Sequence, residues 1–340
     1  MSHLFEPRLV NDVFGDPGLY VEFRDERRAL LFDIGDIRAL PPRKLMRLSH
    51  VFVTHTHMDH FAGFDDLLRI VLGRKDRVTF YGGPGFVDQV EHKLRAYTWN
   101  VVHRYDMELV IEARALAADG RGTSATFSSR QRFERVEGPA FATQGDVLHD
   151  EAAFRVRARF VDHEMPCLSY AIEEKAHVHV AKDRIAALGV TPGPWLRALK
   201  HAVLAGAPDE TPIELRWRDR EGEHGGARTV GELKPVILGV VAGERVGYVT
   251  DLRYTEANVA ALAALLEGVD QLFIESVFLH EDAEQAARKN HLTARQAGGI
   301  ARRVGAKALV PFHFSPRYEG RAAEVQAEAI AAWTALGSVP

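Results

Sequence analysis

The sequence predicts an α/β protein in which short apolar strands alternate with helices and chemically active side chains follow the strand ends. Two observations support this prediction. The apolar run Val51-Phe52-Val53 leads directly into Thr54-His55-Thr56-His57-Met58-Asp59-His60, and a helical stretch begins near Asp65. Other histidines and acidic residues, far apart in the sequence, also stand just beyond apolar strands. Functional groups gathered at strand ends are typical of active sites in α/β and αββα proteins.

The loop from His55 to His60 is the strongest indication of chemistry in the chain. Its three imidazoles and one carboxylate suit a cation such as Zn²⁺, which accepts nitrogen and oxygen ligands. Alternation of side chains along the chain places His55 and His57 on one side and Asp59 and His60 on another. This arrangement can supply ligands to two adjacent metals. A histidine-rich surface loop that binds nothing is the alternative. The strand-end histidines and aspartate elsewhere favour the two-metal interpretation.

Composition is that of a soluble globular protein, with 340 residues, 46% hydrophobic and 26% charged. No apolar run approaches the roughly 20 residues of a membrane helix, and the longest candidate, 235–242, is interpreted as a buried strand. Glu6 and Arg8 interrupt the stretch where a signal peptide needs an apolar core. We therefore expect a cytoplasmic protein with no membrane segment.

Cysteine content and net charge restrict the partners. Cys167 is the single cysteine, so an intrachain disulfide and an all-thiolate zinc site are both excluded. Any metal must therefore be held by histidine and carboxylate. The net charge of −4 gives no global attraction for nucleic acid, although a local basic patch can still bind phosphates.

Four strands and two helices are expected in the first part of the chain. We expect strands at 20–23, 29–32, 49–54 and 78–81, and helices at about 65–72 and 86–97. The second strand ends in Asp33-Ile34-Gly35. Asp33 is interpreted either as a turn cap or as an acceptor that orients a metal-bound histidine.

Short antiparallel strands are expected between residues 101 and 160, at 109–113, 125–128, 132–136 and 154–161. His92, His103 and His149 are interpreted as ordinary surface or turn residues. The last strand runs into Asp162-His163-Glu164, which puts His163 at a strand end. An isolated histidine usually has only a local hydrogen-bond partner, but the loop at His55 favours His163 as a further ligand.

The segment 173–234 differs in character. It contains Gly189-Val190-Thr191-Pro192-Gly193-Pro194-Trp195, with Arg197 and Lys200 nearby, and the highly charged stretch 216–226. Its glycine and proline density favours a projecting arm or loop over a second core, and a disordered surface insertion is the alternative. Basic residues beside Trp195 are compatible with a nucleic-acid contact.

The remainder again alternates strand and helix. Strands are expected at 236–241, 245–250, 271–274 and 308–310, and helices at about 256–266, 281–288 and 293–304. Four polar residues stand at the ends of these elements: Asp251, Glu275, His291 and His313.

These segments carry a family resemblance. The loop His55-Thr56-His57-Met58-Asp59-His60 resembles the signature of the metallo-β-lactamase superfamily. The stretches Gly189-Val190-Thr191-Pro192-Gly193-Pro194 and His313-Phe314-Ser315-Pro316-Arg317-Tyr318 resemble its ribonuclease Z branch, the transfer-RNA 3′-end processing endonucleases. The resemblance implies a single domain over 1–340, built as an αββα four-layer sandwich with a projecting arm within 173–234. It also implies a homodimer.

Carried over position by position, the resemblance implies a dinuclear zinc site, with Mn²⁺ as the alternative metal. One zinc is held by His55, His57 and His163, the second by Asp59, His60 and His313, and Asp251 bridges both. His291 matches the family's proton donor to the leaving oxygen, and Glu275 matches its acidic partner.

The leading hypothesis is a zinc-dependent hydrolase that cleaves the 3′ trailer of precursor transfer RNA. Two divalent cations activate water and neutralise charge on a phosphodiester. Asp59 is expected to orient that water or accept its proton. A histidine with a pKa near 7, such as His291 tuned by Glu275, is suited to protonating the leaving oxygen.

Two other functions stay open. The first keeps the metal site but hydrolyses a small phosphodiester, sulfate ester or lactone. The acidic net charge favours it, as do departures from the family pattern at Thr250, Leu252 and Ile274, whereas the Gly-Pro stretch favours RNA. The second is an inactive metal-binding or RNA-binding protein, which is disfavoured because every ligand position that matches the family is filled.

Overall fold

The structure is a computed structural model that describes residues 4–24, 26–175, 177–180, 184–185, 188–218, 222–241 and 243–335. The chain forms two compact units. The larger unit contains Met1–Glu173 and Glu244–Pro340, and the smaller one contains Glu174–Gly243. Within the described residues, no helix is both long enough and apolar enough to cross a membrane.

The first sheet of the larger unit has nine strands in the described part of the chain, ordered β1 to β8 with β9 beside β7. The strands β3 to β6 run parallel, and the pairs at either end are antiparallel. Its strands are β1 (Phe5–Leu9), β2 (Leu19–Phe23), β3 (Ala29–Phe32), β4 (Leu48–Phe52), β5 (Arg77–Gly82), β6 (Val110–Leu116), β7 (Arg121–Ser128), β8 (Arg135–Glu137) and β9 (Phe141–Ala142).

The second sheet has the order β10-β11-β12-β17-β18-β19. The strands β17, β18 and β19 are parallel, and β12 pairs with β17 in the antiparallel direction. Its strands are β10 (Val147–Asp150), β11 (Phe154–Asp162), β12 (Pro166–Glu174), β17 (Arg245–Val249), β18 (Gln271–Glu275) and β19 (Ala308–Phe312).

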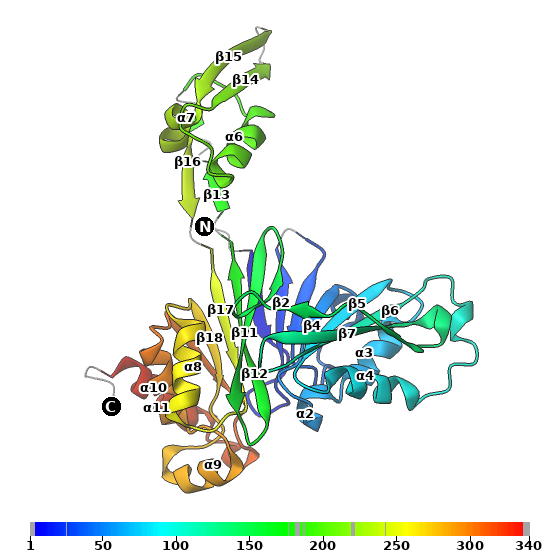
Figure 1. The fold of residues 1–340 in the computed structure, drawn as a ribbon. Helices are drawn as coiled ribbons and strands as arrows, with labels where there is room; N and C mark the ends of the chain where they lie inside the picture. Colours follow the sequence, from blue (N-terminus) through cyan, green and yellow to red (C-terminus); the bar gives the residue numbers. More distant parts are fainter. Residues whose placement is uncertain are drawn as a thin grey trace. The chain divides into compact units, whose positions relative to one another are not determined.

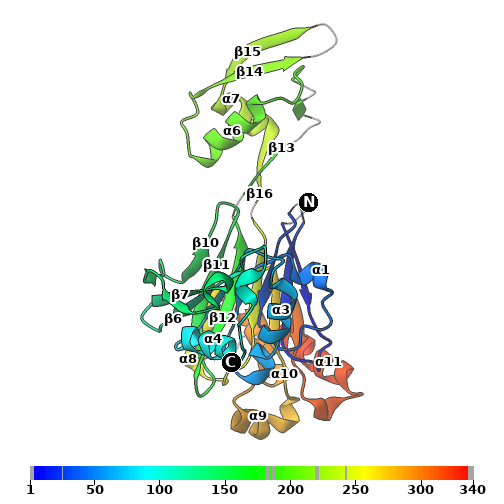
Figure 2. The same ribbon diagram turned by 90° about the vertical axis from the view of Figure 1, so that its right-hand side faces the viewer.

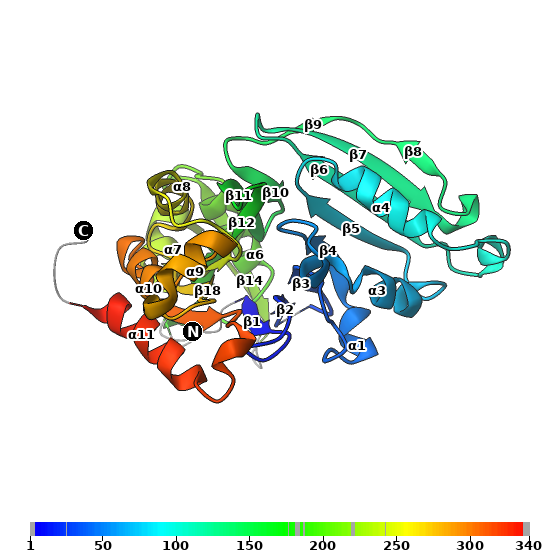
Figure 3. The same ribbon diagram turned by 90° about the horizontal axis from the view of Figure 1, so that it is seen from below.

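Helices cover the outer face of each sheet, which gives the four layers of the predicted αββα sandwich (Figures 2 and 3). On the first sheet these are α1 (Pro42–Leu45), α3 (Phe64–Val71) and α4 (Phe86–Arg95). On the second they are α8 (Glu256–Leu266), α10 (Ala294–Arg303) and α11 (Ala322–Thr334). The short helices α2 (Met58–Phe61) and α9 (Ala283–Lys289) lie at one end of the sandwich, together with the 3-10 turns His280–Asp282 and Pro316–Tyr318 (Figure 1). The 3-10 turns Val102–Arg104 and Ser129–Gln131 belong to the first half of the chain.

Alternation along the strands explains how the sheets pack on both faces. Leu31 and Val51 point into the core beneath the helices of the first sheet, whereas Phe32 and Phe52 point into the core between the sheets. The rings of Phe32 and Phe52 stack with centroids 5.1 Å apart, and Phe32 also meets Tyr170 of the second sheet at 5.5 Å. Such strands are apolar on both faces, so their ends are where polar side chains can gather.

Several residues that follow the strand ends adopt left-handed backbone conformations. Asp33 after β3, Asp251 after β17 and His313 after β19 have φ angles of 58°, 50° and 59°. These conformations are unfavourable for residues with side chains and persist where the surrounding structure imposes them, often at functional sites. These strained residues therefore indicate a functional site where the strand ends meet.

Two glycines allow the histidine loop to pack closely against the turn after β3. Ile34 N donates to His60 O at 2.9 Å, and Gly63 N donates to Ile34 O at 2.8 Å. A Cβ atom on Gly35 would collide with the carbonyl oxygen of Asp59, and one on Gly63 would collide with the carbonyl oxygen of Gly35. Both glycines are therefore required for this close backbone approach.

The smaller unit is inserted in the chain between β12 and β17. It has its own core, whereas its glycine and proline density had favoured a projecting arm or loop over a second core. It contains α6 (Trp195–Leu204), α7 (Val230–Ile237) and the strand pairs β13 (His177–Val180) with β16 (Leu238–Val241) and β14 (Pro212–Arg218) with β15 (Glu223–Thr229). Trp195 and Leu199 pack with Ile213, Leu215 and Leu233. Helical and strand periodicity at these positions outweighs the neighbouring glycines and prolines. Residues 219–221 of the charged stretch lie outside the described residues.

Other sequence predictions also need correction. The stretch 235–242 was expected to be a strand, but α7 continues to Ile237 because a Thr229–Glu232 capping box starts a helix upstream. His149 was expected at the surface or in a turn. It lies half-buried in β10, where its Nδ1 accepts from the Tyr81 hydroxyl at 3.1 Å and its Nε2 faces Glu151 at 2.8 Å.

Candidate metal centre

The strand ends of both sheets bring the expected metal ligands together. The segment after β4 contributes His55, His57, Asp59 and His60 from the first sheet. The second sheet contributes the remaining ligands, which are His163 in the β11–β12 turn, Asp251 after β17 and His313 after β19. Their potential ligand atoms form two groups, and within each group all lie within 4.8 Å of one another.

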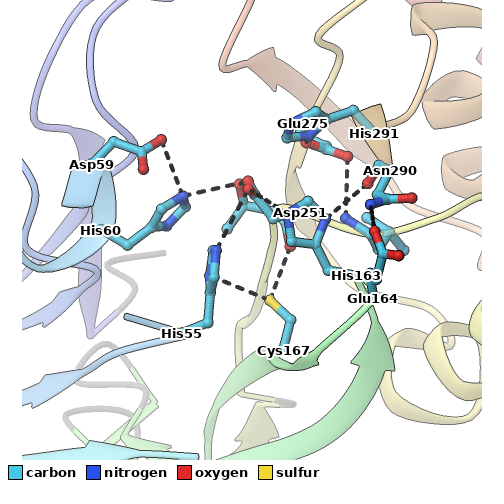
Figure 4. A network of polar contacts seen from close by, with 12 residues as sticks. His55, Asp59, His60, His163, Glu164, Cys167, Asp251, Glu275, Asn290 and His291 are labelled. Carbon is cyan, nitrogen blue, oxygen red and sulfur yellow. Dashed lines mark hydrogen bonds and ion pairs between the residues drawn. The ribbon is translucent and has the colours of Figure 1, made fainter. Parts of the chain in front are cut away.

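The first group consists of His55, His57, His163 and Asp251. The Oδ2 atom of Asp251 lies 3.7 Å from His55 Nε2 and 3.4 Å from His163 Nε2 (Figure 4). The rings of His55 and His57 are 4.3 Å apart at their centroids, with an interplanar angle of 68°. This arrangement presents three imidazoles and one carboxylate oxygen to a common point.

The second group consists of Asp59, His60 and His313. Asp59 Oδ2 lies 3.5 Å from His60 Nε2 and 3.7 Å from His313 Nε2. The other oxygen of Asp251, Oδ1, lies 3.4 Å from His60 Nε2. The two oxygens of Asp251 therefore face the two groups separately, which is the geometry of a bridging carboxylate (Figure 4).

Unsatisfied nitrogen atoms test whether these residues fit bound metals. Among the described residues, His55 Nε2 and His60 Nε2 are both buried and have no hydrogen-bond partner. A buried polar atom without a partner costs about 1–3 kcal/mol. A cation in each group would give these nitrogens a partner of the required kind. The buried histidine and aspartate clusters therefore fit a dinuclear metal site.

Hydrogen bonds on the far side of the rings fix their orientation. His60 Nδ1 donates to Asp33 Oδ2 at 2.9 Å, and Asp33 also accepts from the Tyr248 hydroxyl at 3.0 Å. His163 Nδ1 donates to the carbonyl oxygen of Asn290 at 2.8 Å. With Nδ1 engaged, each ring presents Nε2 to the metal groups. Of the two interpretations of Asp33, the structure shows the acceptor that orients a histidine.

Asn290 is a functional residue that the sequence analysis missed. It acts through its backbone carbonyl and adopts a left-handed conformation with φ of 61°. Asparagine tolerates this conformation better than most residues, and its place just before His291 was the only available signal. Thr54 was missed as well, and its backbone nitrogen donates to Asp33 Oδ1 at 2.7 Å.

Electrostatics in the centre reflect the crowding of imidazoles and carboxylates. Burial alone lowers the pKa of His60 and His313, but the Asp251 carboxylate reverses this and raises both pKa values well above the ordinary value. The pKa of His55 falls to about 3 because the ring is buried and lies near His60. The negative charge of the carboxylates therefore favours positive charge in the centre, which a bound cation would supply.

His291 and Glu275 form a pair beside the second group. His291 Nδ1 lies 2.8 Å from Glu275 Oε2, and Leu292 N donates to the other oxygen of Glu275 at 2.9 Å. Burial lowers the pKa of His291, but the charge and hydrogen bond of Glu275 outweigh burial and raise it. Burial raises the pKa of Glu275, but His291 outweighs burial and brings it to about 2.

A cavity of about 460 Å³ opens over the centre. The side chains of His57, Asp59, His163, Asp251, His291 and His313 line it, while His55, His60 and Glu275 are buried behind them. The structure thus places every site residue predicted from the sequence in or directly behind one cavity. Arg288 and Lys289, at the end of α9, also line the cavity and had not been singled out.

A further group of potential ligands, His50, His149 and Glu151, lies between the sheets. Arg28 already occupies this place, with its guanidinium paired to both oxygens of Glu151 and 3.3 Å from His50 Nδ1. The positive charge of Arg28 disfavours the binding of a metal cation at the same place. This group is therefore a polar network at the sheet interface.

Comparisons with known proteins agree with this geometry. A family model described as "Beta-lactamase superfamily domain" matches residues 28–181 and 208–314. Ribonuclease Z of Deinococcus radiodurans is 33% identical over 293 residues, which are 85% of this chain and 83% of the relative. Ribonuclease Z of Brevibacillus brevis is 27% identical over 312 residues, which are 89% of this chain and 80% of the relative.

Solved structures share the fold at lower identity. Human tRNase Z, short form, is 16% identical with a TM-score of 0.52, over 93% of each chain. The metallo-β-lactamase fold protein YhfI from Bacillus subtilis is 16% identical with a TM-score of 0.51, over 96% of this chain and 92% of that one. Because the family model and the Deinococcus relative both match most of its length, the chain belongs to the metallo-β-lactamase superfamily, among the ribonuclease Z-like proteins.

Proposed function

We propose that the protein is a dinuclear zinc phosphodiesterase that removes the 3′ trailer of precursor transfer RNA. The observation that carries the proposal is the Asp251 carboxylate, whose two oxygens face two separate ligand groups beside the His291–Glu275 pair. The name of the 33% identical relative, ribonuclease Z, supports RNA as the substrate.

Bound in the two ligand groups, divalent cations would supply Lewis acidity toward a phosphodiester and a water molecule. Arg288 and Lys289 on the cavity wall bind the phosphate groups of the substrate. The carboxylate of Asp59 orients the attacking water or accepts its proton. Protonated His291 donates Nδ1–H to Glu275, which leaves Nε2–H to protonate the leaving oxygen.

The proposal also includes the metal, the oligomeric state and the cellular location of the protein. Zinc is the physiological metal, with Mn²⁺ as the alternative, because zinc suits a donor set rich in imidazole nitrogen. The protein acts as a homodimer, which light scattering after size-exclusion chromatography would measure. It acts in the cytoplasm, where precursor transfer RNA is the partner.

Hydrolysis of a small phosphodiester is the second candidate. The cavity of about 460 Å³ has the size of small-ligand pockets, which favours such a substrate. Two of the three departures from the family pattern give it less support than they did in the sequence. Leu252 and Ile274 are fully buried in the core beneath α8 and α10 and do not line the cavity. These two substitutions change packing behind the site. The third, Thr250, contacts a ligand, because its hydroxyl donates to Asp251 Oδ1 at 2.7 Å.

Cleavage of precursor transfer RNA is the direct test of the proposal. We expect the zinc-loaded protein to cut a precursor with a 3′ trailer after the discriminator base. Asp59→Ala should abolish the cut, because the variant lacks a ligand of the second group. His92→Ala serves as the control, since His92 lies in α4 outside the ligand groups, and should retain activity. Hydrolysis of aryl phosphodiesters without cleavage of RNA would indicate that the natural substrate is a small phosphodiester.

The acid role of His291 predicts a dependence on the leaving group. His291→Ala should slow RNA cleavage by about 10²–10⁴-fold, the usual contribution of a general acid. Hydrolysis of an activated aryl phosphodiester should change far less, because an aryloxide leaves without a proton. Both rates are measured on the same preparation. Equal losses on the two substrates would remove His291 from this role.

The pair also predicts a shift of the pH profile. Glu275 raises the pKa of His291, and the acid works only while His291 is protonated, so activity is lost as pH rises through that pKa. Glu275→Gln removes the charge but keeps an oxygen to accept from Leu292 N. In this variant, the alkaline limb of the pH profile of kcat/KM should therefore move to lower pH. An unmoved limb would contradict the coupling of Glu275 to His291.

A further inference from the structure

Another cavity, with a largely apolar lining that also carries arginines, lies in the helical layer that covers the second sheet. The helices α8, α10 and α11 lie beside one another there (Figure 1). Between them is a cavity of about 370 Å³ whose lining includes Tyr254, His280, Arg295, Gln296, Gly299 and Arg302. None of the residues described as lining it also lines the metal cavity.

The outer face of α10 forms one wall of this cavity. Arg295, Gly299 and Arg302 are spaced four and three positions apart, which places them on one side of the helix. A Cβ atom on Gly299 would meet nothing within 4 Å, whereas one on Gly298 would collide with the carbonyl oxygen of Ala329 in α11. Helix packing therefore requires Gly298 but not Gly299. Gly299 leaves open space although a glycine inside a helix costs about 0.5–1 kcal/mol relative to alanine.

Two arginines of this wall, Arg295 and Arg302, differ from the third, Arg303, which also lines the cavity. Among the described residues Arg302 Nε is buried without a hydrogen-bond partner, and Arg302 Nη1 donates to the carbonyl oxygen of Ala335 at 3.1 Å. Within the described part of the chain, neither Arg295 nor Arg302 has an ion-pair partner, in contrast to Arg303, which pairs with Glu256 at 2.9 Å. The guanidinium groups of Arg295 and Arg302 therefore favour a phosphate or carboxylate. The Glu328 carboxylate lies at the same wall, where its Oε1 atom accepts from the backbone nitrogens of His280 and Arg295.

Tyr254 adds an aromatic surface to these charges. It is 51% exposed, although large apolar and aromatic side chains are mostly buried in this protein. An exposed ring beside arginines suits a nucleobase, which stacks on aromatic side chains at a gain of about 1–3 kcal/mol per base. His280 and the amide of Gln296 add hydrogen-bonding groups to the same lining.

We propose that this cavity binds a nucleotide unit, with the phosphate against Arg295 and Arg302 and the base against Tyr254. A free nucleotide and a nucleotide within single-stranded RNA share this chemistry. Tyr254 follows Asp251 by three positions and Arg295 follows His291 by four, so the same chain segments contribute to both cavities. The RNA source rests on the proposed function, whereas nucleotide binding itself does not.

Photolabelling of the full-length, metal-loaded protein with 8-azido-AMP tests the proposal. We expect tandem mass spectrometry to locate label on Tyr254 or its immediate neighbours, and unmodified AMP to compete for it. Gly299→Leu places a side chain in the open space beside Gly299, where a Cβ atom meets nothing within 4 Å, and should abolish this label. The double variant Arg295→Ala/Arg302→Ala should weaken AMP competition about tenfold or more, because hydrogen bonds to charged groups are lost.

Controls separate this binding from the metal centre and from misfolding. Arg95→Ala, an exposed arginine of α4 outside this cavity, should label like the wild type. Label confined to the metal cavity would overturn the proposal, and so would label at Tyr254 that persists in both cavity variants. The double variant changes only partly exposed side chains, so it stays informative if Gly299→Leu lowers the melting temperature.

Competition with RNA distinguishes the two sources of the nucleotide. If a single-stranded oligoribonucleotide displaces the label at much lower concentration than AMP, the cavity receives a nucleotide of an RNA strand. If AMP and the oligoribonucleotide compete equally well, the ligand of the cavity is a free nucleotide. Both results support the cavity as a nucleotide site. Failure of precursor transfer-RNA cleavage would leave labelling at Tyr254 unchanged, so the two proposals fail separately.

Discussion

The carboxylate of Asp251 is the contact on which the rest of the site depends. It is 2% exposed and strained at φ of 50°, and it stands where ligands from two sheets meet. Its Oδ2 atom faces His55 and His163, and its Oδ1 atom faces His60. Because the ligands come from both sheets, the packing between the sheets sets the distance between the two metal groups.

Aromatic residues between the sheets supply that packing and also hold the ligands. Tyr248 packs near Phe32 across the interface and donates its hydroxyl to Asp33, which orients His60. Tyr170 donates to the carbonyl oxygen of Val53 at 2.7 Å, at the entry to the histidine loop. The same side chains thus stabilise the core and fix the centre. Substitution of either tyrosine is expected to disturb both, since a buried partner would be left unpaired.

The sequence predicted the strands and the polar residues at their ends because both have local signatures, whereas the four layers and the division of the ligands between two metals came from the family resemblance. Strand periodicity and the spacing from His55 to His60 are visible in short windows, and ligands at strand ends follow from the fold. Contributions through the backbone have no such signature, which is why the carbonyl of Asn290 was missed. The core of the smaller unit was missed because Trp195 and Ile213 meet only in the folded chain. His149 was misplaced because its partner Tyr81 lies far away in sequence.

The number of zinc ions per chain is the decisive measurement for a dinuclear site bridged by Asp251. It is measured by inductively coupled plasma mass spectrometry on the zinc-reconstituted wild type and on Asp251→Ala, with Asp119→Ala as an exposed control. We expect two ions per chain in the wild type and the control, and fewer than one in Asp251→Ala, because the two carboxylate oxygens of Asp251 face both ligand groups. A wild type that binds a single ion, or an Asp251→Ala variant that retains two, would contradict the bridged dinuclear site.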